Sequence, residues 1–315
     1  MRSVTPYEKN LLVLLVLFSF LAGYFIWSEF SYLKTEKIKS EHESLALGST
    51  FLEYVGEAQA FSVYDADDRR FIFEKNSQTA RPLASITKVM TAVVALQILG
   101  KDETLRISNE ALMPEGDEGL RSGEKWEASD LASFTLINSS NDGALALALA
   151  AGEELRKKNN DSRGPLQLFL QAMNDKARRL GLATLHFESP NGLDINDITP
   201  TAFGSSSEVA QLFSFAITLY PEVFGATKND TLLFNSQSGF VHTAKNTNRS
   251  IGKIPGFIAS KTGYTESAGG NLVIAYRAEN GHTIVLAVLG SSKEGRFNDI
   301  EGLVRTANEY IKIKN

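Results

Sequence analysis

The longest hydrophobic stretch of the chain is an uncharged run near the N-terminus. Leu11–Trp27 reads LLVLLVLFSFLAGYFIW, and seventeen residues lie at the short end of the lengths that cross a bilayer as a helix. Arg2 and Lys9 precede the run, which by the positive-inside rule places the N-terminus in the cytoplasm. We therefore expect a cytoplasmic segment (residues 1–10) and one transmembrane signal anchor (residues 11–27) in the cell membrane.

A cleaved signal peptide is the alternative interpretation of this run. The apolar part of a signal peptide usually has about 7–15 residues and is followed by a small-residue cleavage site. The run here is longer and no such site follows it closely, which favours the uncleaved anchor. Both interpretations place the following residues on the extracytoplasmic face, where the charged stretch 28–55 is expected to form a juxtamembrane linker.

Beyond the linker, apolar and polar positions first alternate and then merge into an apolar run. Ala58–Tyr64 and Arg70–Phe73 flank the turn-forming Asp65–Asp68, which predicts a strand, a turn and a second strand. Ser85–Leu99 has apolar side chains on every face. We therefore expect a helix that is buried in the domain and that ends at Gly100.

The middle of the domain reads as helices separated by polar or glycine-containing breaks. Apolar runs follow helix-start signals in several places, whereas Ile107–Trp126 reads as a loop with one short helix. The polar segment Asn138–Gly143 separates the first two helices of this region. The expected helices are Ser129–Ile137, Ala144–Ala151, Pro165–Leu180 and a segment from Ser206 or Ser207 to Leu219, with Gly152 and Gly181 ending the second and third.

Strand patterns return in the last third of the chain. Phe257–Tyr264 is expected to be a strand. Asn271–Ala278 and His282–Leu289 flank Asn280-Gly281, and Asn-Gly is the strongest short signal for a hairpin. A closing helix is expected over Arg296–Ile311.

These patterns predict one α+β domain over residues 56–315, in which strands from both ends form a sheet and a helical subdomain, about residues 85–250, is inserted between them. The composition, 43% hydrophobic and 22% charged, is ordinary for a domain with a core. With a net charge of −5 and no long basic run, nucleic acid is not expected as a partner. Because cysteine is absent and no H-E-x-x-H occurs, we predict no disulfide, no metal site and no cofactor.

Ser85 and Lys88 are the first candidate catalytic residues. Three positions apart on a helix, their side chains rise from one face, and Ser85 is expected to cap the helix. A serine hydroxyl needs an adjacent base to act as a nucleophile, and Lys88 can be that base if burial or a second cation lowers its pKa. S-x-x-K also occurs at Ser31, Ser122 and Ser250, but only Ser85 opens a long apolar helix. An isolated S-x-x-K is more often an ordinary helix start, so the assignment depends on further motifs.

Two such motifs follow in order. Ser139-Ser140-Asn141 begins 54 residues after Ser85, and Lys261-Thr262-Gly263 begins 122 residues after Ser139. The set S-x-x-K, S-x-N and K-T-G is typical of class A β-lactamases and penicillin-binding proteins. K-T-G occurs once in the chain, and each motif falls on the expected type of element.

Over most of Glu57–Asn315 the sequence resembles the low-molecular-mass penicillin-binding proteins, the serine D-alanyl-D-alanine carboxypeptidases. The resemblance implies the penicillin-recognising serine transferase (β-lactamase/transpeptidase-like) fold, an antiparallel sheet packed against helices with the site between the sheet and the helical subdomain. It also implies peptidoglycan stem peptides ending in D-Ala-D-Ala as substrates and β-lactams as covalent inhibitors. The resembling stretches are Tyr64–Asp67, Pro82–Lys88, Glu115–Asp117, Asn141-Asp142, Pro190–Asp194, Asn246–Asn248 and Lys261–Thr265.

Catalytic roles follow from this resemblance. Ser85 would attack the carbonyl of the penultimate D-Ala, Lys88 would take its proton, and Ser139 would relay a proton to the leaving amine. Lys261 would keep Lys88 neutral by like-charge repulsion. The backbone N–H groups of Ser85 and Tyr264 would form the oxyanion hole.

Substrate-binding roles follow in the same way. Asn141 would hold the substrate amide and orient the lysine base, and Lys261 and Thr262 would bind the terminal carboxylate. Gly263, which lacks a side chain, would let the substrate backbone lie along the strand edge. Relatives often have an arginine in the stretch around Thr247 that this chain lacks, so the carboxylate contact made by that arginine is not expected here.

Other functions share part of this pattern. A class A β-lactamase would need a glutamate base in an E-x-x-L-N loop, and Glu188–Asn191 lacks both the leucine and the spacing. DD-endopeptidases, transpeptidases and non-catalytic β-lactam or muropeptide sensors remain open. Many of the carboxypeptidases also carry a C-terminal β-domain and an amphipathic anchoring helix. We expect neither here, with the N-terminal anchor replacing the helix.

Overall fold

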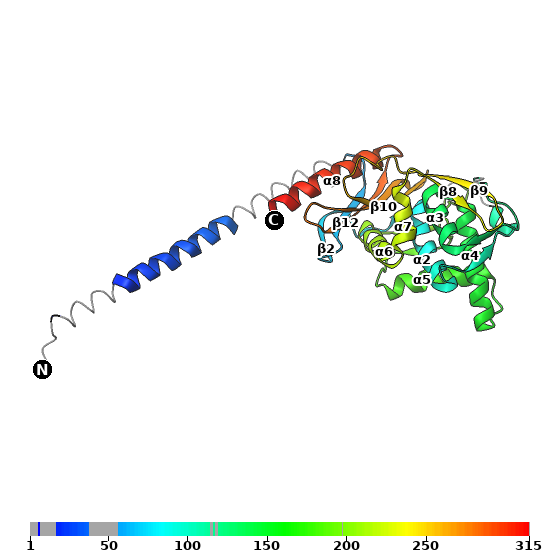
Figure 1. Cartoon of the computed structure of the whole chain (residues 1–315), viewed down its shortest axis with the longest axis horizontal. Coiled ribbons are helices and arrows are strands. Elements are labelled where there is room, and N and C mark those ends of the chain that lie inside the picture. The colour runs from blue at the N-terminus through cyan, green and yellow to red at the C-terminus, as the bar shows by residue number, and fades with distance from the viewer. Residues whose placement is uncertain are drawn as a thin grey trace.

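The computed structural model describes residue 6 and residues 17–37, 56–113, 116, 119–196 and 198–314. Its domain is organised around a five-stranded antiparallel sheet with the strand order β10-β11-β12-β1-β2, so strands from both ends of the domain lie side by side (Figure 1). The α+β prediction is confirmed. The strands of this sheet are β1 (Ala60–Asp65), β2 (Arg70–Lys75), β10 (Phe257–Thr265), β11 (Gly269–Arg277) and β12 (Thr283–Ser291).

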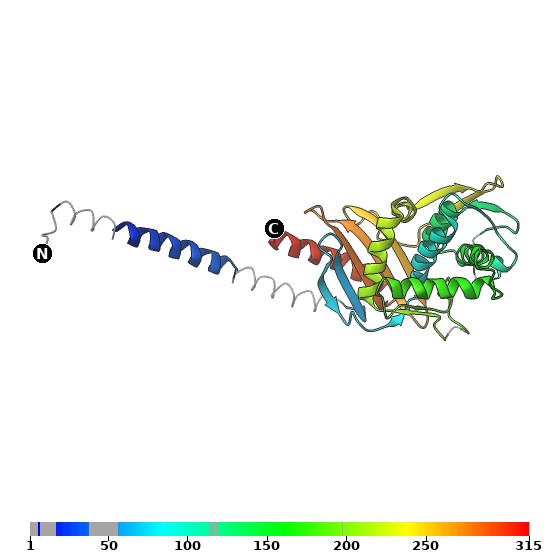
Figure 2. The same ribbon diagram turned by 90° about the horizontal axis from the view of Figure 1, so that it is seen from below.

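The two faces of the sheet are covered by different helices. Side chains alternate between the faces along each strand. On β12, Leu286 packs in one apolar cluster with Ile300 of α8 (Gly295–Lys314), whereas Val285 packs in a second cluster with Phe213 of α6 (Ser206–Leu219). Figure 1 shows α8 and α6 on opposite sides of the strands. Figure 2 shows the helices between residues 88 and 179, in cyan and green, beside the sheet.

α2 (Lys88–Leu99) forms the centre of the helical part. It contacts α3, α4, α5 and α6, and its residues from Lys88 to Leu96 are buried. The prediction of a buried helix that stops at Gly100 is confirmed. The other helices and 3₁₀ turns are α3 (Ala128–Asn138), α4 (Asn141–Asn159), α5 (Pro165–Arg179), α7 (Pro221–Gly225), η1 (Ala84–Thr87), η2 (Glu110–Leu112) and η3 (Ala226–Lys228).

Some local predictions were wrong because tertiary packing overrides local signals. α4 does not stop at Gly152, where a Cβ atom would lie 1.9 Å from the carbonyl oxygen of Pro165. Glycine there allows α4 and α5 to pack closely. Ser205 caps α6 by accepting from the Glu208 N–H. The expected loop over residues 107–126 ends in a strand, and Glu127 rather than Ser129 is the N-cap of α3.

Short strands form three further sheets around the core. One pairs β4 (Thr104–Arg106) with β5 (Lys125–Glu127), and another pairs β8 (Thr231–Asn235) with β9 (Val241–Lys245). The third contains β3 (Arg81–Pro82), β7 (Ala202–Gly204) and β6 (His186–Phe187). β3 leads directly into η1, so this sheet fixes the chain just before the predicted nucleophile.

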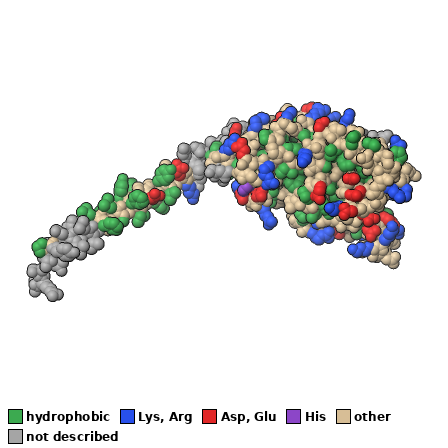
Figure 3. All heavy atoms as spheres, viewed as in Figure 1, with side chains coloured by type: hydrophobic (Ala, Val, Ile, Leu, Met, Phe, Trp, Pro, Cys, Tyr) green, Lys and Arg blue, Asp and Glu red, His purple; other side chains and the backbone are tan. Residues whose placement is uncertain are grey.

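The described part of the predicted anchor is helical. Residues 17–37 form a helix whose large apolar side chains are exposed, with Phe18 at 73% and Trp27 at 65% (Figure 3). Residues 11–16 of the expected anchor and 38–55 of the expected linker lie outside the described residues. In the described ranges no single helix is both long and apolar enough to cross a membrane. Ser206–Leu219 and Pro221–Lys228, which are bent by 109° at the break between them, reach that length and apolar composition only when taken together. The anchor therefore stays a prediction.

Candidate active site

The predicted nucleophile lies in a tight turn rather than at a helix cap. Ser85 is inside η1, and α2 begins at Lys88 with Thr87 as its N-cap, so the prediction that Ser85 caps the helix was wrong. Ala84 has a φ of 48°, a left-handed conformation that costs a non-glycine residue about 1–3 kcal/mol unless its surroundings hold it. One holding contact is local, because the Thr87 hydroxyl donates to the Ala84 carbonyl at 2.7 Å.

The amine of Lys88 lies at the centre of the site. Its Nζ is 2.7 Å from Ser85 Oγ, 2.8 Å from Asn141 Oδ1 and 2.9 Å from the Asn191 carbonyl oxygen, and the residue is fully buried. The 3₁₀ turn serves this contact well, since positions i and i+3 eclipse in that geometry. In its neutral form, an amine held in this way can accept the hydroxyl proton of Ser85.

Ser139 and Asn141 come from the break between α3 and α4. Ser139 ends α3 in the left-handed conformation, with a φ of 61°, and Ser140 then caps α4. Across this reversal Asn141 Oδ1 reaches Lys88, while Ser139 Oγ accepts from Lys261 Nζ at 2.8 Å. The structure thus brings the three sequence motifs together by direct hydrogen bonds.

Lys261 is a second buried amine beside the first. It is 1% exposed, and its Nζ also donates to the Thr262 carbonyl at 2.9 Å. Burial, followed by the charges of Lys88 and Arg296, holds the pKa of Lys261 well below its usual range. Since like charges disfavour each other, a proton on one of these amines opposes a proton on the other.

Gly263 has a packing role that its sequence motif did not predict. A Cβ atom at this position would lie 2.8 Å from the Leu83 carbonyl oxygen and 3.2 Å from the Ser85 nitrogen. Glycine therefore lets β10 approach the turn that carries the nucleophile. The predicted reason, room for the substrate backbone, stays a prediction.

The residues on either side of Gly263 are also held in place. Thr262 Oγ1 lies 2.5 Å from Thr247 Oγ1, and the Tyr264 hydroxyl donates to Glu266 at 2.7 Å. Thr262 is buried and Tyr264 is partly exposed. Thr247 therefore adjoins the K-T-G motif.

Sequence reasoning missed an arginine beside this motif. Arg296, at the start of α8, is 7% exposed and donates through Nη1 to the Gly263 carbonyl at 2.6 Å. Arg249, which follows the Thr247 stretch in sequence, pairs instead with Glu294 on the surface. Helical periodicity could not mark Arg296, because only the packing of α8 on the sheet brings it to the site.

The segment Pro190–Gly192 is a further part of the site that sequence reasoning left without a role. Thr91 Oγ1 donates to the Pro190 carbonyl at 2.6 Å, and the next carbonyl, that of Asn191, accepts from Lys88. Gly192 has a φ of 76°, and a Cβ there would lie 2.0 Å from the Ala84 carbonyl oxygen. The segment therefore packs against the turn that carries the nucleophile.

Gly192→Ala should destabilise the domain and slow reaction at the site. The added methyl meets backbone in a close-packed region, which typically costs about 1–3 kcal/mol, and it pushes Ala84 and the Asn191 carbonyl out of place. Gly181→Ala is the matched control, because its φ is also positive, 74°, while a Cβ there has nothing within 4 Å among the described residues. Thermal unfolding and penicillin acylation of both variants measure the difference. Equal effects would show that backbone conformation alone, and not the contact, is responsible.

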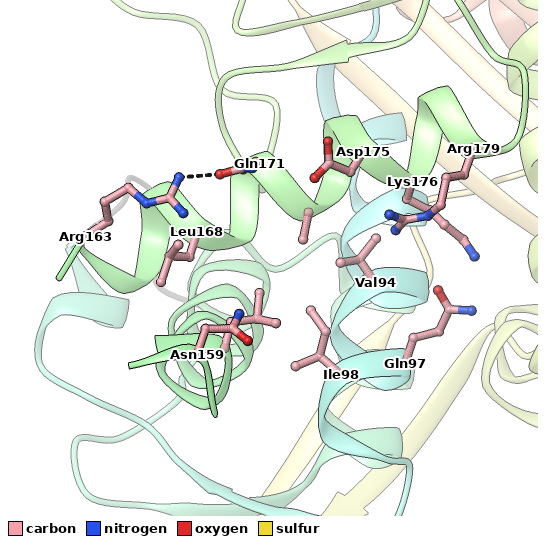
Figure 4. Close-up of a pocket in the computed structure, with 12 residues that line it drawn as sticks. Val94, Gln97, Ile98, Asn159, Arg163, Leu168, Gln171, Asp175, Lys176 and Arg179 are labelled. Carbon is pink, nitrogen blue, oxygen red and sulfur yellow. Dashed lines mark hydrogen bonds between the residues drawn. The ribbon is translucent and has the colours of Figure 1, made fainter. Parts of the chain in front are cut away.

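A cavity of about 300 Å³ lies between α2, α4 and α5. Figure 4 shows Val94 and Ile98 of α2 facing Leu168 and Asp175 of α5 across it, with Lys176 at its rim. None of the residues of the three motifs lines this cavity. It is therefore separate from the site around Ser85.

One three-residue group in the described ranges has the side chains to hold a metal ion. Ligand atoms of Asp65, Asp68 and His282 lie within 4.8 Å of one another. Asp65 Oδ1 accepts from the N–H groups of Asp67 and Asp68, and His282 Nδ1 lies 3.0 Å from Asp65 Oδ2. The bond to Asp65 raises the pKa of His282. These contacts already use the buried carboxylate to join the β1–β2 and β11–β12 turns.

Comparison with known proteins gives this site a family. The Peptidase_S11 family, described as D-alanyl-D-alanine carboxypeptidase, matches residues 54–293. The D-alanyl-D-alanine carboxypeptidase DacB2 of Mycobacterium tuberculosis is 30% identical over 243 residues, 76% of this chain and 77% of the relative. DacF of Bacillus subtilis is 28% identical over 250 residues, and this match covers 77% of this chain and 59% of the relative. A D-alanyl-D-alanine endopeptidase of Escherichia coli is 27% identical, over 80% of this chain and 77% of the relative.

Solved structures agree with the sequence comparison. A D-alanyl-D-alanine carboxypeptidase from M. tuberculosis matches with a TM-score of 0.68 and 26% identity, over 82% of this chain and 92% of that one. Penicillin-binding protein D2 of Listeria monocytogenes, in its ampicillin-bound form, matches with a TM-score of 0.63 and 28% identity, over 79% and 96%. The fold is thus that of the DD-peptidases and penicillin-binding proteins. The chain belongs to the D-alanyl-D-alanine carboxypeptidase family, which confirms the prediction of a serine enzyme of this kind.

Proposed function

We propose that the chain removes the terminal D-Ala from peptidoglycan stem peptides on the extracytoplasmic face of the cell membrane, through an acyl-enzyme at Ser85. The observation that carries this proposal is the 2.7 Å contact between Lys88 Nζ and Ser85 Oγ. It joins a partly exposed hydroxyl to a buried amine, with Lys261 as a second amine nearby. Such a pair suits nucleophilic catalysis because the base is desolvated and lies beside a like charge.

Acylation follows from these positions. Ser85 Oγ attacks the carbonyl of the penultimate D-Ala while its proton passes to Lys88, and negative charge develops on the carbonyl oxygen. The N–H groups of Ser85 and Tyr264 stabilise that oxygen, and losing one such donor typically costs about 10²–10³ in rate. The C–N bond then breaks, and the amine of the terminal D-Ala leaves with the proton that Lys88 accepted, relayed through the hydroxyl of Ser139, so that Lys88 is neutral again. The Ser139 hydroxyl also contacts Lys261.

Hydrolysis of the ester completes the cycle. Water attacks the acyl carbonyl and gives a proton to Lys88, the same oxyanion donors stabilise the intermediate, and Ser85 Oγ leaves with that proton. Splitting one difficult amide hydrolysis into two easier steps is the usual gain of covalent catalysis. Asn141 supports both steps, because its contact with Lys88 fixes the direction of the amine.

The terminal carboxylate of the substrate is proposed to bind at the K-T-G motif. Thr262 and Thr247 offer hydroxyl groups 2.5 Å apart, and Lys261 and Arg296 supply positive charge from β10 and α8. Arg296 replaces the missing arginine of the Thr247 stretch in this proposal. A guanidinium suits a carboxylate, since its planar donors match the two oxygens.

The alternative is a DD-endopeptidase on the same site, which the likeness to the endopeptidase of E. coli favours. The test is to incubate the full chain in detergent with muropeptides and to identify the products by mass spectrometry. Loss of one alanine from a pentapeptide stem supports the carboxypeptidase. Cleavage of cross-linked dimers alone supports the endopeptidase, and acylation without turnover supports a sensor.

Membrane attachment through Leu11–Trp27 is a further part of the proposal. The mature protein should stay in the membrane fraction after high-salt and carbonate washing, because a spanning helix resists both. Phe18→Asp with Leu21→Asp is the matched variant, and two aspartates near the centre of the run cost about 5 kcal/mol of insertion free energy. The variant protein should be released from the membrane fraction by these washes. A wild-type protein that is soluble and starts beyond Trp27 would show a cleaved signal peptide instead.

A further inference from the structure

Asn271 is a fully buried amide on β11 that contacts the turn carrying the nucleophile. Its Nδ2 donates to the Pro82 carbonyl at 2.9 Å and to the Leu83 carbonyl at 3.1 Å. Its Oδ1 accepts from the Gly290 N–H of β12 at 2.9 Å. One side chain therefore joins two strands of the central sheet to the two residues before Ala84.

The register of the sheet explains how Asn271 reaches so far. Asn271 is the direct cross-strand partner of Gly263, and paired residues of neighbouring strands face the same side of a sheet. Because Gly263 has no side chain, the Leu83 carbonyl fits over it, where a Cβ would be only 2.8 Å away. The amide of Asn271 then binds this carbonyl from the adjacent strand.

We propose that Asn271 is a positioning residue that sets the two halves of the oxyanion hole against each other. The Ser85 N–H belongs to the turn that Asn271 holds. The Tyr264 N–H belongs to β10, one residue beyond the cross-strand partner of Asn271. This inference rests on the proposed function, since it assigns both N–H groups to the hole.

The backbone of the turn explains why an anchor is needed there. Ala84 is held at a φ of 48°, and a residue in that conformation relaxes when its surroundings no longer hold it. Without the amide of Asn271, the buried Leu83 carbonyl loses its donor from the sheet and keeps the Ile86 N–H, at 3.2 Å, which belongs to the same turn. The Leu83–Ser85 backbone is then no longer tied to β11 and can rotate. The Ser85 N–H then points away from the developing charge, while the noncovalent contacts of the substrate with the K-T-G motif remain.

The main test is acylation and deacylation of Asn271→Ala by labelled penicillin, with rates expressed per active site from burst titration. Both rate constants should fall by about 10–100-fold, which is less than the effect of about 10²–10³ expected when an oxyanion donor is removed altogether. The dissociation constant of the noncovalent complex with penicillin should be unchanged. A purely structural role would lower the melting temperature and the fraction of active protein, but not the rate per active site.

Asn271→Asp gives a second readout that depends on pH. Its carboxyl group keeps an acceptor for the Gly290 N–H, and when protonated it can donate to one of the two carbonyls. When ionised it repels both carbonyls. Because burial raises the pKa of such a carboxyl, the acylation rate of the Asp variant divided by that of the Ala variant should exceed one at low pH and fall as pH rises. Dividing by the rate of the Ala variant removes the pH effects that the two variants share.

Ser62→Ala is the matched control. Ser62 is also fully buried in the central sheet, and its hydroxyl lies 2.8 Å from that of Ser206 in α6. Its loss should change stability and leave the rates per active site unchanged. Wild-type rates per active site in Asn271→Ala, or a ratio that does not change with pH, would overturn the positioning role. A wild-type chain that is never acylated at Ser85 would instead overturn the proposed function.

Discussion

Ser85→Ala should abolish covalent labelling by penicillin and hydrolysis of D-Ala-D-Ala peptides. The hydroxyl is the proposed site of the acyl bond, and losing the nucleophile of a serine enzyme typically lowers kcat by about 10⁶-fold. Folding should be almost unchanged, because Ser85 lies within a 3₁₀ turn and is not the cap of α2. Mass spectrometry of the labelled peptide and thermal unfolding of the variant measure the two effects.

Two other serines of S-x-x-K motifs provide the controls. Ser250 is fully buried and its hydroxyl donates to Glu301, whereas Ser122 lies in a turn before β5. Ser122→Ala and Ser250→Ala should keep full labelling per folded molecule. Label found on either of these serines would contradict the assignment of Ser85, and with it the mechanism.

Lys261→Ala should lower the acylation rate by about 10²–10³, the usual effect of removing one group that stabilises charge in a site. It should also move the pH dependence of acylation to higher pH. The sign follows from like-charge repulsion, because a cation near Lys88 disfavours the protonated form of that amine. Without Lys261, Lys88 keeps its proton to higher pH, and the neutral base is available only there.

Lys261→Arg separates charge from shape. It keeps a cation near Lys88, but its planar guanidinium is larger and hydrated differently, so activity should lie between those of Ala and wild type. The second-order acylation constant of Ser85 across pH is the measurement for all three proteins. Thermal unfolding checks the fold, since Lys261 is buried.

A shift of the pH profile in Lys261→Ala would also show that Lys261 carries a positive charge in the resting enzyme. Burial and the charge of Lys88 hold the pKa of Lys261 well below its usual range, so a proton shared by the pair can reside on either amine. If Lys261→Ala acylates like wild type at every pH, Lys261 contributes neither charge nor binding, and the role given to the K-T-G motif is wrong.

Local patterns were enough to predict most elements of this fold. The alternation around Asp65–Asp68 and around Asn280-Gly281 predicted two pairs of antiparallel strands. The apolar side chains on every face of α2 predicted its burial. Predictions were wrong where a distant contact decides, as at Gly152, whose missing Cβ fits the backbone at Pro165. A glycine in a helix and a glycine that ends one look alike in sequence.

The sequence by itself determined the chemistry, because reaction type depends on residue types, and Ser85, Lys88, Ser139 and Lys261 lie in three motifs that can be read directly. Only the tertiary structure decided the positions and charges of these groups. The Asn191 carbonyl at Lys88, Arg296 at Gly263 and Asn271 at Leu83 join residues that are far apart along the chain. Such contacts leave no local period, and a lowered lysine pKa comes from burial and neighbouring charge, which exist only after the sheet and helices have packed.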